Sequence, residues 1–104
     1  MFARVTRAQI DTDTVSVEDA LRRFQAAAMP SLQEQHGYRG LCVLAGQEGE
    51  VLLVSFWATE ASAHALEDGG WYFEVLRDFI TLLQAEPGRA TYEVLAADLS
   101  RATS

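Results

Sequence analysis

The spacing of hydrophobic and polar positions changes along the chain, and these changes predict the order of its elements. Residues 2–10 mix apolar, β-branched and polar side chains, which is typical of a strand. After Ser16 the apolar residues fall at helical spacing, and Ser16 with Asp19 three positions later resembles a capping box. The apolar positions are Val17, Ala20, Leu21, Phe24, Ala27 and Ala28. Pro30 predicts a kink or a break in this helix, with 31–35 as a separate turn.

The rest of the pattern predicts three more strands and two further helical segments. Residues 41–45 and 51–57 are short β-type runs, and the glycine-bracketed loop between them is typical of a hairpin. Thr59 is a candidate cap for a helix over 60–67. Another helix is marked by a stripe of apolar residues, and a last strand is expected over 90–97. The stripe consists of Tyr72, Val75, Leu76, Phe79, Ile80 and Leu83.

The resulting order, β-α-β-β-α-β, is that of the ferredoxin-like fold. This is an α+β class with a four-stranded antiparallel sheet. No repeat, linker or low-complexity tract divides the sequence. We therefore expect one domain over residues 1–100 and a short tail over 101–104.

The strand expected over 51–57 is apolar on both sides. Val51, Leu53 and Trp57 alternate with Leu52, Val54 and Phe56, whereas a strand with one wet face alternates apolar with polar residues. Helices that connect neighbouring strands of this fold lie on one side of the sheet, so they leave the other face uncovered. An exposed apolar face of that size is costly and unusual in a monomer. We therefore expect a homodimer in which a second copy covers this face, sheet to sheet, in a barrel-like core.

Composition excludes several classes of function. The chain has 15 acidic and eight basic residues, a net charge of −7, and all eight basic residues are arginine. The lack of lysine excludes a Schiff base and a P-loop lysine, and the acidic balance argues against a nucleic-acid partner. No apolar run reaches the ~18 residues of a membrane span, so no membrane partner is expected. The single cysteine and the absence of an export signal favour a cytoplasmic location.

Three segments carry a resemblance to a known family. They are Phe2-Ala-Arg-Val-Thr, Met29-Pro-Ser-Leu-Gln-Glu-Gln-His-Gly-Tyr-Arg-Gly-Leu and Leu52-Leu-Val-Ser-Phe-Trp-Ala-Thr-Glu-Ala-Ser-Ala. Together they resemble the antibiotic biosynthesis monooxygenase (ABM) family of dimeric α+β barrels. The resemblance implies a small pocket within each protomer, between the sheet and the helices. Members of the family include cofactor-free oxygenases acting on aromatic polyketides, haem-degrading enzymes and small-molecule isomerases, so the fold alone does not choose the chemistry.

The haem-degrading branch of that family is not supported by the residues. Its asparagine, tryptophan and haem-ligating histidine match Thr6, Leu66, and Val75 or Leu76 of this sequence. All three family residues are therefore lost, and Leu76 cannot ligate iron. No cofactor is therefore expected, and two histidines without nearby carboxylate spacing do not predict a metal site.

Histidine and arginine supply the candidate catalytic groups. His64 and His36 are the side chains suited to acid–base chemistry near neutrality, and His64 is the candidate base if it lines the pocket rather than facing water. His36 precedes a helix-ending glycine, where its role is structural. If Arg4 and Thr6, on one side of the first strand, face the pocket, they can hold a ligand oxygen and stabilise an enolate or phenolate. Otherwise Arg4 reaches the sheet edge and pairs with a glutamate such as Glu93.

Aromatic residues are the candidate pocket walls. Trp57, Trp71 and Tyr72 suit a planar aromatic ligand, although aromatic residues at helical spacing also form ordinary cores. Cys42 lies mid-strand, where a small buried hydrophobic residue is expected rather than a nucleophile.

These observations lead to one leading function and two alternatives. By resemblance, the leading function is a cofactor-independent monooxygenase that acts on an electron-rich aromatic small molecule. Arg4 would hold the anion and His64 would be the base, while Thr6, Trp57, Tyr72 and Trp71 would contact the substrate. The alternatives are a non-catalytic dimer that binds a small ligand or haem, and a structural dimer whose own aromatic residues fill the cavity.

Overall fold

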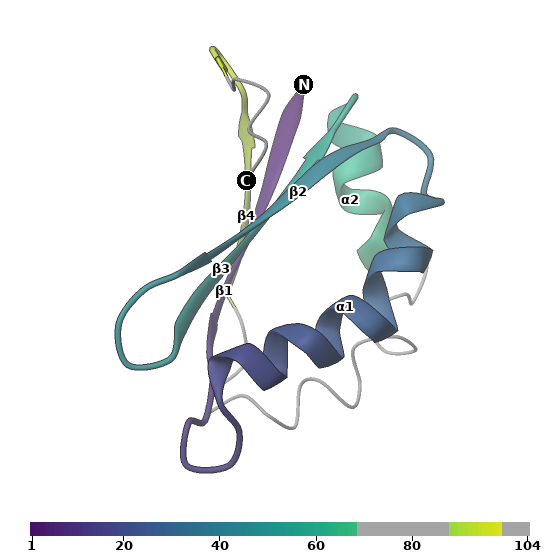
Figure 1. The fold of residues 1–104 in the computed structure, drawn as a ribbon. Helices are drawn as coiled ribbons and strands as arrows, with labels where there is room; N and C mark the ends of the chain where they lie inside the picture. The colour runs from purple at the N-terminus through teal and green to yellow at the C-terminus, as the bar shows by residue number, and fades with distance from the viewer. Residues whose placement is uncertain (69–87, 99–104) are drawn as a thin grey trace.

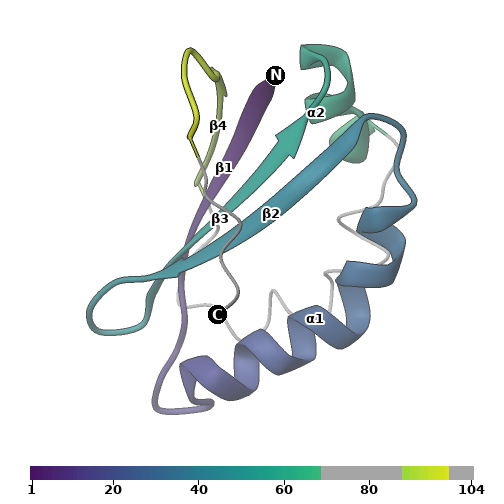
Figure 2. The same cartoon turned by 45° about the horizontal axis from the view of Figure 1, so that its top comes forward.

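The sheet and the two helices that cover it follow the predicted order. The structure is a computed structural model and describes residues 1–68 and 88–98. It contains strands β1 (Phe2–Gln9), β2 (Tyr38–Ala45), β3 (Glu50–Trp57) and β4 (Gly88–Glu93), and helices α1 (Val17–Gln33) and α2 (Glu60–Asp68). The strands form one antiparallel sheet in the order β2-β3-β1-β4, and both helices lie on the same side of it (Figures 1 and 2). The predicted α+β, ferredoxin-like fold is confirmed, while the helix expected around Tyr72–Leu83 lies outside the described residues.

Helix α1 begins where its cap predicts and continues past its proline. The Ser16 hydroxyl accepts a hydrogen bond from the Asp19 backbone N–H at 3.1 Å, which satisfies one free donor of the first turn. Pro30 lies inside the helix, so the predicted separate turn is wrong. A proline this close to the end removes one late hydrogen bond, and the packing of Leu32 holds the last turn in place. No helix in the described part of the chain is long and apolar enough to span a bilayer.

The second and last strands differ in length from their predicted ranges. β2 begins at Tyr38, three residues early, because Tyr38 pairs with Trp57 on the neighbouring strand. β4 ends at Glu93 rather than at 97. Glu93 pairs with Phe2, the first residue of β1, and one further bond runs from the Val94 N–H to the Met1 carbonyl.

The inner face of the sheet, toward the helices, holds the core of the protomer. Ile10, Val15, Ala20 and Val51 form one buried cluster at the start of α1. Farther along the sheet, a second cluster of buried residues lies at the end of α1 and the start of α2. It consists of Leu32, Trp57 and Ala63.

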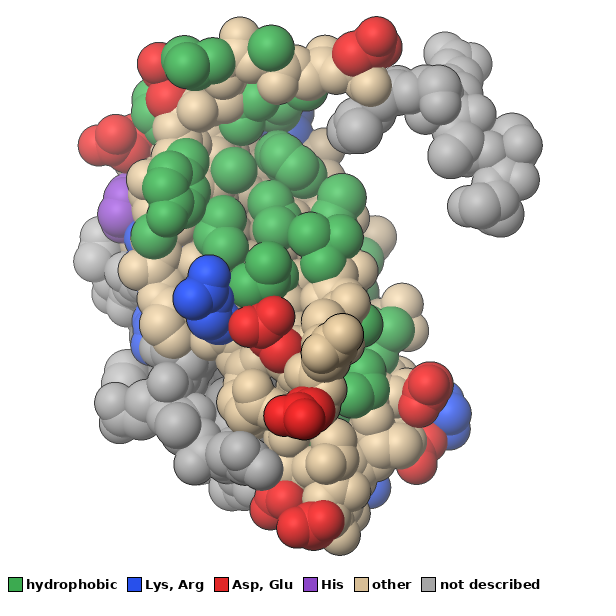
Figure 3. Space-filling view, turned by 90° about the vertical axis from the view of Figure 1, so that its left-hand side faces the viewer, with side chains coloured by type: hydrophobic (Ala, Val, Ile, Leu, Met, Phe, Trp, Pro, Cys, Tyr) green, Lys and Arg blue, Asp and Glu red, His purple; other side chains and the backbone are tan. Residues whose placement is uncertain are grey.

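The outer face of the sheet is apolar and is left uncovered by α1 and α2. Figure 3 shows hydrophobic side chains gathered across the strands on this side. We call this set the outer patch: Val5, Cys42, Leu44, Leu52, Val54, Phe56, Ala90 and Tyr92. Leu44 and Tyr92 are 51% and 58% exposed.

The predicted burial of Cys42 is wrong for the single chain. Cys42 is exposed, because it alternates with Leu41 and Val43 and so lies on the outer face of the sheet.

Candidate active site

Two polar side chains of β1 are buried on the inner face of the sheet. Arg4 is 8% exposed and Thr6 is 9% exposed, whereas Arg7 is exposed on the other face. The strand period of two residues accounts for this, since positions 2, 4, 6 and 8 share one side. Of the two placements that the sequence left open for Arg4, the structure has the one in which Arg4 and Thr6 lie on the helix side of the sheet.

A series of hydrogen bonds, here called the polar chain, joins Arg4 to His64 through Thr91 of β4. The Arg4 Nη1 atom donates to the Thr91 hydroxyl at 2.6 Å. The same hydroxyl oxygen lies 3.1 Å from Nε2 of His64 on α2. Three elements thus bring together the two residues that sequence analysis selected as catalytic. The hydrogen-bond partner observed for Arg4 is Thr91, not Glu93.

The direction of the hydrogen bonds follows from the chemistry of the groups. A guanidinium only donates, and a threonine hydroxyl can accept two hydrogen bonds and donate one. Arg4 takes one acceptor position of the Thr91 oxygen. The hydroxyl can then donate to Nε2 of His64 or accept from it, and the tautomer of His64 sets which of the two occurs. When Nε2 carries the ring hydrogen and donates, Nδ1 is left to take up a proton.

A second set of hydrogen bonds holds the backbone of Arg4 from the side of the core. Ser55 pairs with Arg4 across β1 and β3, and its hydroxyl donates to the Arg4 carbonyl at 3.4 Å. The Trp57 indole N–H donates to the same hydroxyl at 2.8 Å. The Trp57 side chain is fully buried, so the structure places it in the core that supports Arg4.

Tyr38 packs against Trp57 at the edge of this core. Their rings meet edge to face, with centroids 5.7 Å apart. Burial, with a smaller contribution from the charge of Cys42, raises the pKa of the Tyr38 hydroxyl. The neutral phenol is therefore the form that the packed ring favours.

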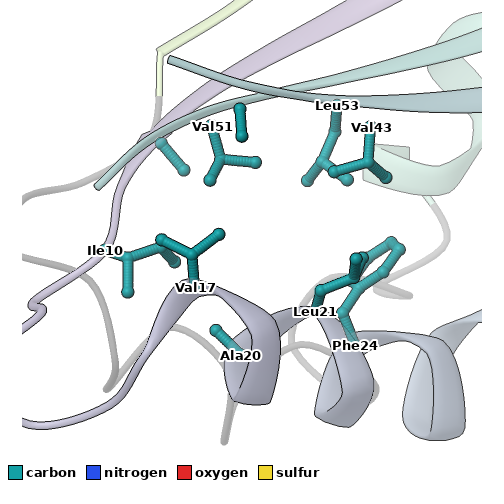
Figure 4. A pocket seen from close by; sticks show the side chains of 10 residues that line it. Ile10, Val17, Ala20, Leu21, Phe24, Val43, Val51 and Leu53 are labelled. Atoms are coloured by element: carbon teal, nitrogen blue, oxygen red, sulfur yellow. The ribbon is translucent and has the colours of Figure 1, made fainter. Parts of the chain in front are cut away.

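An apolar cavity of about 80 Å³ lies on the same inner face, between the sheet and the first half of α1 (Figure 4). From α1, side chains at helical spacing line it: Val17, Ala20, Leu21 and Phe24. Ile10 closes one end, and the opposite wall comes from the inner face of three strands. That wall consists of Ala8, Val43, Ala45, Val51 and Leu53.

The cavity and the polar chain are neighbours along β1. Ala8 lines the cavity, and Thr6 and Arg4 follow it on the same face. With a rise of about 3.3 Å per residue, the Cα atoms of Ala8 and Arg4 are about 13 Å apart. Thr6 lies between them and pairs with Leu53, which also lines the cavity.

Sequence analysis selected part of this site and missed one member. Trp71 and Tyr72 lie outside the described residues. His36 is exposed and lies apart from the polar chain. Thr91 was not selected, although its β-branched side chain on the last strand was visible. Its role depends on its register with Arg4, which no local pattern predicts. In the part of the chain that the structure describes, no three His, Cys, Asp or Glu side chains are grouped to hold a metal ion.

Comparisons with known proteins find solved structures that share this fold. No family model matches the sequence, and no curated protein matches it. Solved structures do match. A monooxygenase from Streptomyces coelicolor, solved with the ligand nanaomycin D, has a TM-score of 0.77 at 16% identity over 94% of this chain and 90% of its own. This chain has the ABM fold. A putative antibiotic biosynthesis monooxygenase from Nitrosomonas europaea matches at a TM-score of 0.73 and 15% identity, over 92% of this chain and all of its own.

A further match has the higher identity of 25%. It is a protein of unknown function from Nitrosomonas europaea, with a TM-score of 0.72 over 97% of this chain and 95% of its own. The resemblance noted in the sequence is thus confirmed at the level of the fold. The fold does not specify the reaction, which depends on the residues of the site.

Proposed function

We propose that this chain is an ABM-like, cofactor-independent monooxygenase that acts on an electron-rich aromatic small molecule. The observation that carries the proposal is the chain from the Arg4 guanidinium through the Thr91 hydroxyl to His64. It places a permanent cation and a candidate base around one hydroxyl on the inner face of the sheet. That combination suits a reaction in which a proton leaves a substrate and the resulting anion must be stabilised.

The proposed reaction needs only the substrate, dioxygen and these side chains. A ring C–H proton passes to His64, and Arg4 stabilises the oxygen on which the negative charge is delocalised. The carbanion donates its electron pair to dioxygen and forms a C–O bond. The peroxide takes up a proton and loses water, so that a CH₂ group becomes a ketone and one oxygen atom leaves as water.

The remaining site residues shape the place where the substrate binds. Thr6 is the second polar group on the inner face of β1 and can donate to a ligand oxygen. Trp57 acts from the core, by holding Ser55 against Arg4. Trp71 and Tyr72 are proposed as further walls of the same site. The Streptomyces coelicolor monooxygenase, solved with nanaomycin D, supports the view that this fold holds an organic ligand.

The functional unit is proposed to be a homodimer. The outer patch spans all four strands, and α1 and α2 both lie on the opposite face. A second copy packed sheet to sheet would remove this apolar surface from water. The polar chain and the cavity would remain inside each protomer.

Oxygen uptake with a panel of quinols and anthrones tests the proposed reaction. We expect uptake with at least one compound, and a large loss of kcat/KM in Arg4→Met and His64→Gln. Arg22→Met is the matched control, because Arg22 forms an exposed ion pair with Asp19 on α1. Absence of uptake with every compound, or equal rates in all variants, would contradict the proposal.

A non-catalytic binding protein is the second candidate. It is favoured by the cavity itself, whose described lining contains no acid or base. On this alternative the chain binds a small apolar molecule without turning it over, because a cavity of about 80 Å³ does not hold haem. Binding of such a molecule in the cavity, with no oxygen uptake on any quinol or anthrone, would favour it.

A further inference from the structure

The apolar cavity beside α1 is too small for the proposed aromatic substrate. Its volume is about 80 Å³. An apolar protein cavity that accepts benzene or xenon has about 150 Å³. The cavity is thus about half the size of one that holds a single aromatic ring, which favours an occupant smaller than the organic substrate.

The described lining offers a water molecule no polar side chain. The described lining is made of Ala, Val, Ile, Leu and Phe side chains (Figure 4). A buried water needs two to four polar partners, and apolar cavities without them stay dry. A small apolar molecule can occupy such a space without losing hydrogen bonds, and it gains contacts with the side chains around it.

We propose that this cavity binds dioxygen, as the store of second substrate for the proposed oxygenase. This inference rests on the proposed function, because dioxygen is the one small apolar reactant in that reaction. The position fits, since Ala8 in the cavity wall lies on the same face of β1 as Thr6 and Arg4, and the Cα atoms of Ala8 and Arg4 are about 13 Å apart. The organic anion would be held at Arg4 while dioxygen reaches it from the apolar side.

Direct binding of dioxygen can be measured without any turnover. Under oxygen pressure, paramagnetic broadening of methyl NMR signals reports where dissolved oxygen resides. We expect the strongest broadening at Val17, Leu21 and Leu53, which line the cavity. Leu32, which is buried in a different cluster, and Leu95, which is exposed and lies outside the outer patch, are the controls.

A cavity-filling variant then connects the site to the reaction. Ala20→Leu adds bulk to a buried position on the cavity side of α1, and Ala27→Leu makes the same change on the exposed side of that helix. We expect Ala20→Leu to lose the selective broadening and to raise the KM for dioxygen several-fold, with the KM for the organic substrate unchanged. Ala27→Leu should behave as the original chain. Ala8→Val is the second filling variant if Ala20→Leu does not fold.

The outcomes separate this inference from the proposed function. No selective broadening in the original chain overturns the dioxygen site, whatever the activity. Broadening with an unchanged KM for dioxygen in both filling variants overturns its role as a store. Broadening with no oxygen uptake on any quinol or anthrone overturns the proposed oxygenase and the store with it, and leaves only a cavity that binds apolar gas.

Discussion

At the scale of single residues, the site depends on a threonine hydroxyl. Thr91 accepts from a buried guanidinium and lies within hydrogen-bond distance of His64, so one oxygen atom fixes the positions of both groups. The backbone of Arg4 is held in turn by Ser55, which Trp57 contacts from the core. Each candidate catalytic group is therefore oriented by a neighbour that is not itself reactive, an arrangement that keeps a site in its working geometry.

Thr91→Val is the variant that tests this arrangement. Valine favours strands, so the change would be neutral or stabilising if the hydroxyl did nothing. We expect instead a loss of about 1–3 kcal/mol in the free energy of unfolding, because the buried guanidinium of Arg4 loses an acceptor. Urea denaturation measures the loss, and ¹⁵N NMR of the His64 ring should show a change in the balance of its tautomers.

Thr91→Ser is the matched variant, since it keeps the hydroxyl and removes only a methyl group. It should retain the tautomer balance of the original chain and most of its stability. A Thr91→Val protein as stable as the original, with the same His64 spectrum, would show that the hydroxyl does not hold the pair.

Tyr38 predicts a pH dependence of stability. Its pKa is raised in the folded chain, chiefly by burial, so the unfolded chain loses the phenol proton first as pH rises. The unfolded state then binds fewer protons, and the free energy of unfolding falls as pH passes the ordinary value of 10.0. Comparison with Tyr38→Phe by urea denaturation at neutral and alkaline pH isolates this effect. An equal fall in the free energy of unfolding of the original chain and of Tyr38→Phe at alkaline pH would contradict the assignment.

The residues of the site differ in how far the sequence could predict them. Arg4 and Thr6 share a face because of strand periodicity, which is a local rule. The proximity of His64 to them depends on where α2 crosses the sheet. The position of Thr91 opposite Arg4 depends on the register between β4 and β1. Register is set by the pairing of distant segments, so the sequence suggested the reactive groups but not the hydroxyl between them.

At the scale of elements, local signals predicted the existence of each described element better than its ends. The Ser16 cap and the helical stripe give α1, and the apolar runs give β2 and β3. The extent of β4 depends on its pairing with β1, and the continuity of α1 past Pro30 is helped by the packing of Leu32. Both are tertiary effects that a local pattern does not contain.

Gly37 joins three elements in a way that a variant can test. It lies in the turn before β2 at a φ of +84°, and a Cβ atom there would come 2.4 Å from the Ser62 hydroxyl oxygen of α2. We expect Gly37→Ala to lower the free energy of unfolding by about 1–3 kcal/mol, from backbone strain and displacement of α2. Gly88→Ala is the control, because a Cβ there meets nothing within 4 Å. Equal effects in thermal denaturation would contradict this reading of the turn.

At the scale of the whole molecule, both faces of the sheet are apolar but only one is covered by α1 and α2. In the sequence, the strand over 51–57 already carries apolar residues on both of its sides. The outer patch contains those that point away from α1 and α2. Alternation along β2 then places Cys42 in the patch, beside Val54 in register. The same geometry that exposes the thiol in one chain would bury it between two.

The proposed dimer can be tested through that thiol and through mass. Light scattering should give twice the 11.5 kDa of one chain, and Cys42 should react slowly with a thiol reagent. Val54→Asp places a charge at the centre of the outer patch, which should yield monomers whose Cys42 reacts quickly, because a buried unpaired carboxylate opposes association. Leu44→Asp makes the same test at a position that is already 51% exposed in the protomer, so its fold is not at risk. Gln47→Asp, in the exposed hairpin loop, carries the same charge away from the patch and should remain a dimer. A monomeric mass for the original chain at micromolar concentration, or fast Cys42 reaction in it, would contradict the dimer and require another partner for the outer face.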